Sequence, residues 1–350
     1  MPQEIRPTTL DDLPELSRFL AEGFHAPADA PFSAPDVLAW KYLDPRGADA
    51  GDAPRSWLAR DEASGAVVGH LGITPGRWRG AGLPAEGVST LHMIDWLSSE
   101  AGRGVGASLM RRAHRGVETG YGLGGSADGR GVGGGGGYGL VRLVPVYQRV
   151  LRPSHHGRAG FSAGGLLRTA RDAARLAARR PKRPGVTVEI EPATAFGDEA
   201  ERVLEAYAPS AAFTTRSAGL MNHMMRYPRG GLTGWVLKGP GGARGFAVLS
   251  VVTGQGGVRV GKVVECLPGG GEPDEAVWHA SFLALTAELK RQGADVARAV
   301  ASTAWSVRAL AASGYARAHD LEFRLRDRSN RLARDGAYHL TFLEADYAYT

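Results

Sequence analysis

Residues 98–110 read SSEAGRGVGASLM, and this stretch decides how the first half of the chain folds. The apolar residues 88–97 before it are typical of a strand, and the residues after it follow a helical pattern to about Arg115. A glycine-rich turn between a strand and a helix presents several unpaired backbone N–H groups at the positive end of the helix dipole. Such a turn suits a phosphate or a pyrophosphate, and a tight turn without a ligand is the alternative.

Two common nucleotide-binding loops are excluded for this turn. No Gly-Lys-Ser or Gly-Lys-Thr follows it, so it is not a Walker loop. Gly102, Gly104 and Gly106 have the wrong third spacing for a dinucleotide fingerprint, and no acidic partner stands at the required distance.

The same order of elements occurs twice along the chain. Short strands open at Ile5 and Ile190, and each is followed by a helical stretch. Two helix ends are closed by Pro-Arg-Gly, at residues 45–47 and 228–230. Two hairpins contain a tryptophan, at residues 57 and 235, and two Gly-Tyr pairs stand at residues 137–138 and 314–315. The matched positions stay about 176 to 185 residues apart, which predicts two copies of one α/β domain.

The repeat and the prolines after residue 180 predict the domain boundaries. We expect an N-terminal domain over residues 1–155, a basic helix and linker over 156–185, and a C-terminal domain over 186–350. The basic helix has apolar residues against arginines, so we expect it to pack across the two domains. Residues 338–343 have the pattern of a last strand.

Composition limits the class of protein. The formal net charge is +6 and the pI is about 9.6, which suits an acidic ligand such as a nucleotide. No apolar run approaches the ~18 residues of a membrane span, and the first residues lack the pattern of a signal peptide. Cys266 is the single cysteine, so no intrachain disulfide can form. We therefore expect a cytoplasmic protein without a membrane partner.

The turn resembles motif A of the GNAT (GCN5-related N-acetyltransferase) superfamily, because its alternating glycines are followed by Leu109 and Met110. The order of elements agrees, and the repeat makes the chain similar to tandem GNAT proteins. The resemblance implies two GNAT-like domains, each with a mixed, mostly antiparallel twisted sheet flanked by helices. It also implies acetyl-CoA or another acyl-CoA as cosubstrate, with its pyrophosphate on the turn. The expected contacts are Trp96, Leu97, Gly102, Arg103, Gly104, Val105, Gly106, Ala107 and Ser126.

The sequence departs from the family pattern at three places. Ala101 stands where the family has Arg or Gln, and Gly133 stands where its common general-acid tyrosine would fall. Residues 133–137 are five glycines where a helix is expected, which disfavours that helix by about 5 kcal/mol. Two interpretations stay open: a loop that a ligand orders, or a site that has decayed.

The second copy of the turn has a different charge. Glu272, Asp274 and Glu275 stand at its helix start, where carboxylates satisfy the helix dipole and repel a pyrophosphate. The first copy has Arg103 and no acid from Ala101 to Val117. We therefore expect acyl-CoA to bind in the N-terminal domain only.

The candidates for catalysis lie on the strand before the turn. An amine must lose a proton when it attacks a thioester, so a base near the strand end helps. Asp95 is nearest to the expected thioester and is the first candidate, followed by His92 and by Glu86 at the strand start. A base acting through water, or an amine that is already neutral, is the alternative.

The main hypothesis is an acyl-CoA-dependent N-acyltransferase that acts on a small-molecule amine, such as an amino sugar, held between the two domains. The amine would attack the thioester directly in the N-terminal domain. One alternative is an aminoacyl-tRNA-dependent transferase of the FemABX type, the only case in which we expect a nucleic acid partner. Another is a catalytically decayed GNAT protein that binds a ligand or joins an assembly. We expect no metal, and the sequence leaves a homodimer open.

Overall fold

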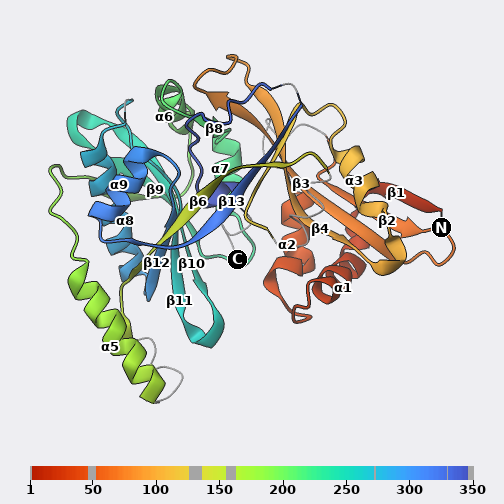
Figure 1. Ribbon diagram of the computed structural model, residues 1–350, viewed down its shortest axis with the longest axis horizontal. Helices are drawn as coiled ribbons and strands as arrows, with labels where there is room; N and C mark the ends of the chain where they lie inside the picture. Colours follow the sequence, from red (N-terminus) through yellow and green to blue (C-terminus); the bar gives the residue numbers. More distant parts are fainter. Residues whose placement is uncertain are drawn as a thin grey trace.

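The computed structural model describes residues 2–45, 53–125, 136–154, 163–271, 273–328 and 330–345 of the chain (Figure 1). Most elements of the first half stand where the sequence predicts them. Its main elements are β1 (Gln3–Pro7), α1 (Leu13–Gly23), α2 (Pro35–Tyr42), β2 (Ser56–Asp61), β3 (Val67–Gly80), β4 (Val88–Ser98), α3 (Val105–Ala113), β5 (Thr119–Leu123) and β6 (Gly139–Val150).

The second half repeats this order after a long helix. Its main elements are α5 (Ala163–Ala178), β7 (Glu189–Ala193), α6 (Glu199–Tyr207), β8 (Ala212–Thr214), α7 (Ala218–Met225), β9 (Leu232–Lys238), β10 (Arg244–Thr253), β11 (Arg259–Leu267), α8 (Glu275–Arg291), β12 (Val296–Val300), α9 (Ala304–Ala312) and β13 (Ala316–Asp327). We call β1–β5 with their helices the N lobe, and β7 and β9–β12 with theirs the C lobe.

One continuous sheet runs through both lobes because the halves exchange a strand. The strand order is β1-β2-β3-β4-β5-β13-β6-β12-β11-β10-β9-β7, with β8 paired to β3. The last strand of the second half, β13, therefore lies beside β5 of the N lobe. In return, β6 lies beside β12 of the C lobe. Figure 1 shows the two strands crossing the centre of the molecule. The two similar lobes expected from the repeat are present, but they share their sheet.

The pairing of β6 with β13 reveals a pseudo-two-fold axis. Val144 and Leu321 are 177 residues apart, as Gly137 and Gly314 are, so they are matched positions of the repeat. They are also direct partners in this antiparallel pair. Two matched positions can face each other in this way only where the axis passes between them. The exchange thus follows the symmetry of the repeat.

The helices α2 and α7 meet near the same axis. Trp40 and His223 are matched positions, and their rings stack with centroids 4.7 Å apart and planes at 2°. The indole N–H of Trp40 also donates to the carbonyl oxygen of His223 at 3.0 Å. Both side chains are buried. This contact fixes one lobe against the other.

Helices cover both faces of the N-lobe sheet. Leu16, Leu20 and Leu38 of α1 and α2 are fully buried on one face, whereas Val105 and Leu109 of α3 are fully buried on the other. At ~25 cal/mol per Å² of apolar surface, each such side chain contributes about 1.5–3 kcal/mol. This packing holds α3, and the turn before it, rigidly on β3 and β4.

Two local expectations are wrong. Helix α5 does not pack across the two lobes: it projects from the molecule (Figure 1), its main contact is with β6, and Leu166 and Leu167 are 59% and 73% exposed. Residues 338–343 do not form a strand of the sheet, since Tyr338 makes an isolated bridge to Ala212 and a 3-10 helix follows at Phe342–Glu344. The domain boundaries at residues 155 and 186 stay a prediction.

No helix in the described part of the chain is both long and apolar enough to cross a membrane.

Candidate functional site

The predicted turn lies between β4 and α3, close against β3. A Cβ atom on Gly102 would lie 2.4 Å from the carbonyl oxygen of Val68, and one on Gly69 would lie 2.4 Å from a side-chain carbon of Val105. Gly104 has φ 89°, a conformation that glycine adopts without strain. The glycines therefore allow the backbone to approach β3 and then reverse into the helix.

The first turn of α3 has no side-chain cap. Gly104 is the N-cap residue, and the helix begins at Val105. The first backbone N–H groups of a helix have no partner within the helix, so they are directed outward here. Among the described residues, the exposed Arg103 forms no hydrogen bond or ion pair. The turn thus combines uncapped amides with a cationic side chain, as an anionic ligand requires.

A bulge at Asp95 distorts β4 just before this turn. The pairing of β3 with β4 shifts by one residue between His70 and Gly72, and Asp95 has φ 47°. Only a few non-glycine residues adopt positive φ, and aspartate is among the more tolerant ones. The bulge turns the Asp95 side chain toward α2, whereas Trp96 packs on the face covered by α3.

The Asp95 carboxylate is buried in an ion pair. Its Oδ2 accepts from Lys41 Nζ at 2.7 Å and from the Tyr42 hydroxyl at 2.5 Å. Burial opposes ionisation, but the charge of Lys41 and these hydrogen bonds outweigh it, so the pKa of Asp95 lies below its usual range. Lys41 Nζ also donates to the carbonyl oxygen of Phe32 at 3.2 Å. This geometry favours a positioning role for Asp95, and its role as a base stays a prediction.

His92 lies where β4 and β5 part. The two strands pair in parallel only over Thr90 to His92 and Thr119 to Tyr121. Beyond that point, residues 93–98 of β4 have no strand partner on this side among the described residues. The His92 ring is buried and stacks on Tyr121 with centroids 5.0 Å apart. Burial lowers the pKa of His92 to about 4, so its imidazole is neutral at pH 7.

The remaining predicted residues are distributed over a wider area. Glu86 is exposed in the loop before β4, and the strand from Val88 to Asp95 alone covers seven residues or about 23 Å. Trp96 lies against α3, since a Cβ atom on Gly106 would be 3.2 Å from its Nε1. Leu97 packs on the opposite face with α1. The structure brings His92 and Asp95 together and separates Glu86 from them. Ser126 and residues 129–135 of the glycine-rich segment lie outside the described residues.

Three histidines of the N lobe make its stability depend on pH. His70 is fully buried, with Nδ1 2.8 Å from the Asp95 carbonyl oxygen and Nε2 2.8 Å from Ser56 Oγ. A carbonyl only accepts, so Nδ1 carries the proton and Nε2 accepts from the serine. Burial lowers the pKa of His70, His92 and His114 to about 4, below the usual 6.5. All three are therefore neutral in the folded protein at pH 5–7.

We expect the free energy of unfolding to fall as the pH drops from about 6.5 to 4. In this range the unfolded chain binds protons that the folded chain does not. Each histidine therefore lowers the free energy of unfolding by up to about 1.4 kcal/mol per pH unit. Chemical denaturation at pH 7, 6 and 5 measures this, and His70→Gln should reduce the slope. Equal stability at pH 7 and pH 5 would contradict these buried neutral histidines.

The matching turn of the C lobe is already capped. Asp274 is the N-cap of α8, and its Oδ1 accepts from the amides of Ala276 and Val277 at 2.8 and 3.4 Å. Gly104 holds the corresponding position in the N lobe. The predicted carboxylate at Asp274 thus occupies amides that would otherwise be open to a ligand.

The gap between β11 and β12 is filled by the protein itself. Only about 10 Å³ of space remains there, lined by residues of both strands and by His339, Leu340 and Thr341. His339 Nε2 lies 3.1 Å from Glu265, which also forms an ion pair of 2.7 Å with the fully buried Arg216. Burial raises the pKa of Glu265, but the two partners outweigh it and bring the pKa to about 2. The C lobe therefore has no room for a ligand at this place.

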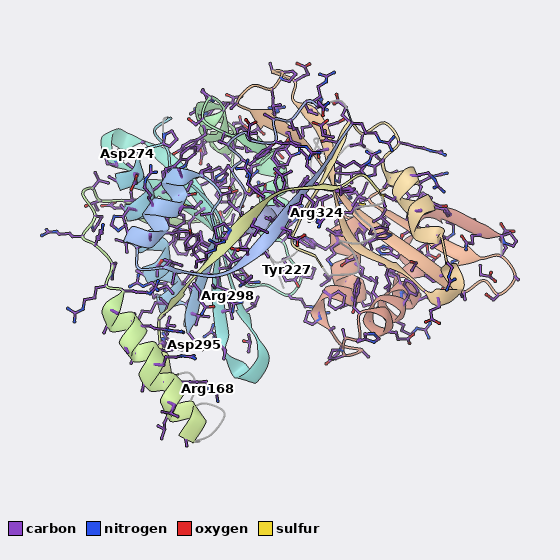
Figure 2. The ribbon with its side chains drawn as sticks, viewed as in Figure 1. Arg168, Tyr227, Asp274, Asp295, Arg298 and Arg324 are labelled. Atoms are coloured by element: carbon purple, nitrogen blue, oxygen red, sulfur yellow. The ribbon has the colours of Figure 1, made fainter. Side chains whose placement is uncertain are left out.

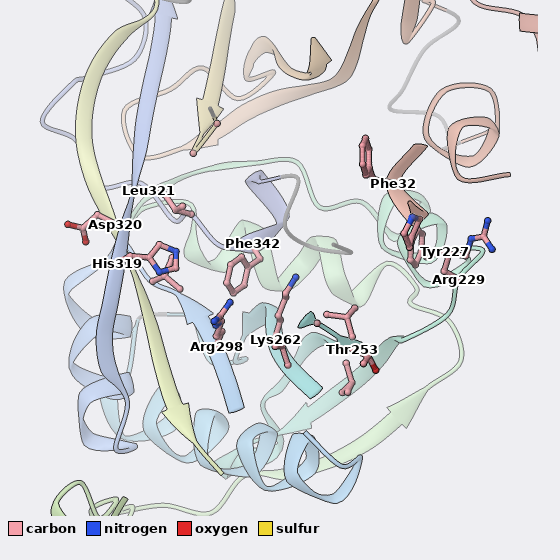
Figure 3. A pocket seen from close by; sticks show the side chains of 18 of the residues that line it. Phe32, Tyr227, Arg229, Thr253, Lys262, Arg298, His319, Asp320, Leu321 and Phe342 are labelled. Carbon is pink, nitrogen blue, oxygen red and sulfur yellow. The ribbon is translucent and has the colours of Figure 1, made fainter. Parts of the chain in front are cut away.

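A cavity of about 940 Å³ opens between the lobes. Gly124 and Gly125, just after β5, line one end, and Phe32 and Tyr227 form a wall. In Figure 3, Lys262 and Arg298 project from the C-lobe sheet toward this space beside Phe342, whereas Asp320 points away. Sequence reasoning missed the lining residues, because they come from nine separate segments and no local pattern connects them.

The described residues contain no group of three or more His, Cys, Asp or Glu side chains that could hold a metal ion.

Comparison with known proteins identifies the fold. No protein-family profile matches the sequence, and no curated protein matches it. Among solved structures, Saccharomyces cerevisiae N-myristoyltransferase with bound myristoyl-CoA and inhibitors is similar, with a TM-score of 0.61 and 12% identity over 93% of this chain and 81% of that one.

Two GCN5-related N-acetyltransferases are also similar. The one from Anabaena variabilis has a TM-score of 0.55 and 12% identity, over 93% of this chain and 72% of that one. The one from Kribbella flavida has a TM-score of 0.55 and 13% identity, over 93% of this chain and 71% of that one. The resemblance inferred from the sequence is thus confirmed at the level of the fold. The chain has a two-lobed fold of the GNAT type.

Proposed function

We propose that the protein is an acyl-CoA-dependent N-acyltransferase whose acyl donor binds in the N lobe only. The observation that carries this proposal is the difference between two matched turns. In the N lobe the helix start is uncapped and flanked by Arg103, whereas in the C lobe Asp274 caps it. The N-lobe strands also part beyond His92, while the C-lobe gap is filled by residues 339–341.

In this proposal the pyrophosphate binds the amides of Gly104 to Ala107, and Arg103 neutralises part of its charge. The thioester then lies beside the unpaired edge of β4, where backbone N–H groups polarise its carbonyl oxygen. The acceptor amine enters from the cavity between the lobes, past Gly124 and Gly125. Acetyl as the acyl group, and a small amine such as an amino sugar as acceptor, are parts of this proposal.

The chemical step is a direct transfer. The amine nitrogen forms a bond to the thioester carbon, the carbon–sulfur bond breaks, and CoA leaves as a thiolate that takes up a proton. The amine loses one proton in this step. His92 is neutral at pH 7 and stands at the parting of the strands, so we propose that it accepts this proton. Asp95, paired with Lys41, holds the bulge that shapes this edge.

The test is acylation of a panel of primary amines with acetyl-CoA, followed by mass spectrometry. We expect at least one amine to be acetylated. Arg103→Glu should lower kcat/KM about 100-fold, because a carboxylate then faces the pyrophosphate. Arg244→Glu, an exposed arginine beside the C-lobe turn, makes the same charge change and should have no effect.

Three other outcomes would overturn the proposal. Equal loss of activity in both variants would contradict donor binding at the N-lobe turn. CoA binding without acylation of any amine would favour a ligand-binding protein that has lost catalysis. Transfer from aminoacyl-tRNA, with no use of acetyl-CoA, would favour the FemABX-type alternative.

A further inference from the structure

A separate cavity of about 340 Å³ lies between α5 and the crossing strands β6 and β13. We call it the α5 cavity. Four arginines line it, Arg149 of β6, Arg175 and Arg179 at the end of α5, and Arg317 of β13, whereas none of its described lining residues is an aspartate or glutamate. Figure 1 shows α5 on the C-lobe side of the molecule, far from α3 and the N-lobe turn.

The arginines reach the α5 cavity from two layers. Arg317 is the strand partner of Tyr147, and Arg149 follows Tyr147 by two residues on β6, so both arginines stand on one face of the sheet. The amide of Arg179 donates to the carbonyl oxygen of Arg175 at 3.0 Å. These two residues are one helical turn apart and lie on the same side of α5. The sheet and the helix thus each supply two guanidinium groups.

The turn after α9 fixes both layers in place. A Cβ atom on Gly314, which has φ 81°, would lie 2.5 Å from the carbonyl oxygen of Arg179. Only glycine allows the helix end to come so close to this turn. Arg149 Nη1 donates to the carbonyl oxygen of Ser313 at 3.0 Å. The α5 cavity is therefore a built site, in which one turn of backbone positions both Arg149 and the end of the helix.

Two of the arginines have carboxylates nearby. Arg317 binds Asp320 with Nε–Oδ1 at 2.7 Å. Asp172 of α5 lies 3.6 Å from Arg175 and 3.3 Å from Arg171, so its charge is divided between two cations. These carboxylates neutralise only part of the positive charge around the cavity.

The other two arginines have no carboxylate partner in the described part of the chain. Arg179 is exposed, and its side chain forms no hydrogen bond or ion pair with a described residue. The Nε of Arg149 is buried and has no acceptor among the described residues. Burial lowers the pKa of Arg149, but a guanidinium stays protonated at neutral pH. Because like charges held together repel each other, an anion in the cavity stabilises this arrangement.

We infer that the α5 cavity binds a small molecule that carries a phosphate or a diphosphate. Guanidinium groups match the geometry of phosphate oxygens, and several of them together match a group with more than one negative charge. The volume is near the lower end of the ~300–1,000 Å³ of small-molecule sites. This site goes beyond the proposed function, because it is separate from both the N-lobe turn and the cavity between the lobes.

The experiment is calorimetric titration of the full chain with pyrophosphate, phosphate and succinate. The chain carries Arg103→Glu/Ala107→Glu, so that two carboxylates on the N-lobe turn repel pyrophosphate there. We expect pyrophosphate or phosphate to bind with a Kd below about 1 mM. Succinate should bind at least about tenfold more weakly, because its two charges stand on separate carboxylates rather than on one compact group. The tighter phosphate probe identifies the class of ligand.

Arg149→Gln and Arg179→Gln, each added to this chain, should weaken the binding about 10- to 100-fold, because each removes charge-assisted hydrogen bonds. Arg168→Gln is the matched control and should leave the Kd unchanged. Arg168 is exposed and does not line the cavity, and Figure 2 shows it toward the end of α5 that projects from the molecule. Thermal denaturation without ligand checks that each variant is folded. Arg179→Gln changes an exposed side chain and disturbs no packing.

Absence of heat with both phosphate probes, equal binding of succinate, or binding that Arg149→Gln and Arg179→Gln leave unchanged would overturn the inference. Binding of a tRNA mixture that Arg179→Gln weakens, without binding of either phosphate probe, would also overturn it and assign these arginines to a nucleic acid surface. None of these measurements uses acyl transfer, so the inference and the proposed function can fail independently.

Discussion

Replacing Asp95 with asparagine is expected to lower the free energy of unfolding by about 3–5 kcal/mol, because one partner of a buried ion pair is removed. Asparagine tolerates the positive φ at this position, so the bulge itself can persist. The cost arises at Lys41, whose side chain is 3% exposed and loses its carboxylate. Chemical denaturation without ligand measures the change.

The double variant Lys41→Met/Asp95→Asn separates the two roles considered for Asp95. It contains no buried charge at this place, so we expect most of the stability to return. If Asp95 acts by position, the double variant keeps kcat within about tenfold of the wild type, whereas loss of a base costs ~10²–10⁴-fold. A stable double variant that has lost more than 100-fold in kcat would assign the proton transfer to Asp95.

Placing two carboxylates on the N-lobe turn is expected to change binding and stability in opposite directions. Arg103 and Ala107 are both exposed, so Arg103→Glu/Ala107→Glu disturbs no packing. Acidic side chains near a helix start stabilise the helix by about 0.3–1 kcal/mol each. The same carboxylates repel a pyrophosphate, and like charges in contact cost several kcal/mol, so we expect affinity for CoA to fall at least ~1000-fold.

Equilibrium dialysis with labelled CoA and denaturation of the unliganded protein measure the two effects. A variant that binds CoA as the wild type does would contradict the assignment of the turn. A variant that loses both binding and stability would show only that the turn is structural.

The fold was largely readable because its signals are local and occur twice. The glycines at 102, 104 and 106 indicate a turn that lies close to β3. The order of strands and helices in the first half recurs after residue 185. The sequence also distinguishes the two turns, since Asp274 has a side chain that can cap a helix and Gly104 has none. Each of these signals is carried by a few neighbouring residues, and the repeat lets the two copies be compared.

The strand exchange could not be predicted in this way. The sequences of β6 and β13 show that both are strands, but strand propensity does not specify a partner. Their placement depends on which neighbours bury Val144 and Leu321 best, a property of the assembled sheet. The tail at residues 338–343 has the pattern of a strand, but residues 339–341 fill the C-lobe gap instead of joining a ladder.

The site was predicted in part. His92 and Asp95 are three residues apart on β4, but the bulge that directs the Asp95 side chain to Lys41 is a tertiary feature. Lys262 and Arg298 are 36 residues apart and become neighbours only when β11 and β12 pair. No periodicity marks either residue, so their place in the lining of the cavity could emerge only from the structure.

Titration calorimetry of CoA into the wild-type protein counts the donor sites of the chain. Because the N-lobe helix start is open and its C-lobe counterpart is capped, we expect one CoA per chain, with the heat abolished by Arg103→Glu/Ala107→Glu and retained in Arg244→Glu. Two equivalents of CoA per chain, or an isotherm that the N-lobe substitutions leave unchanged, would contradict it.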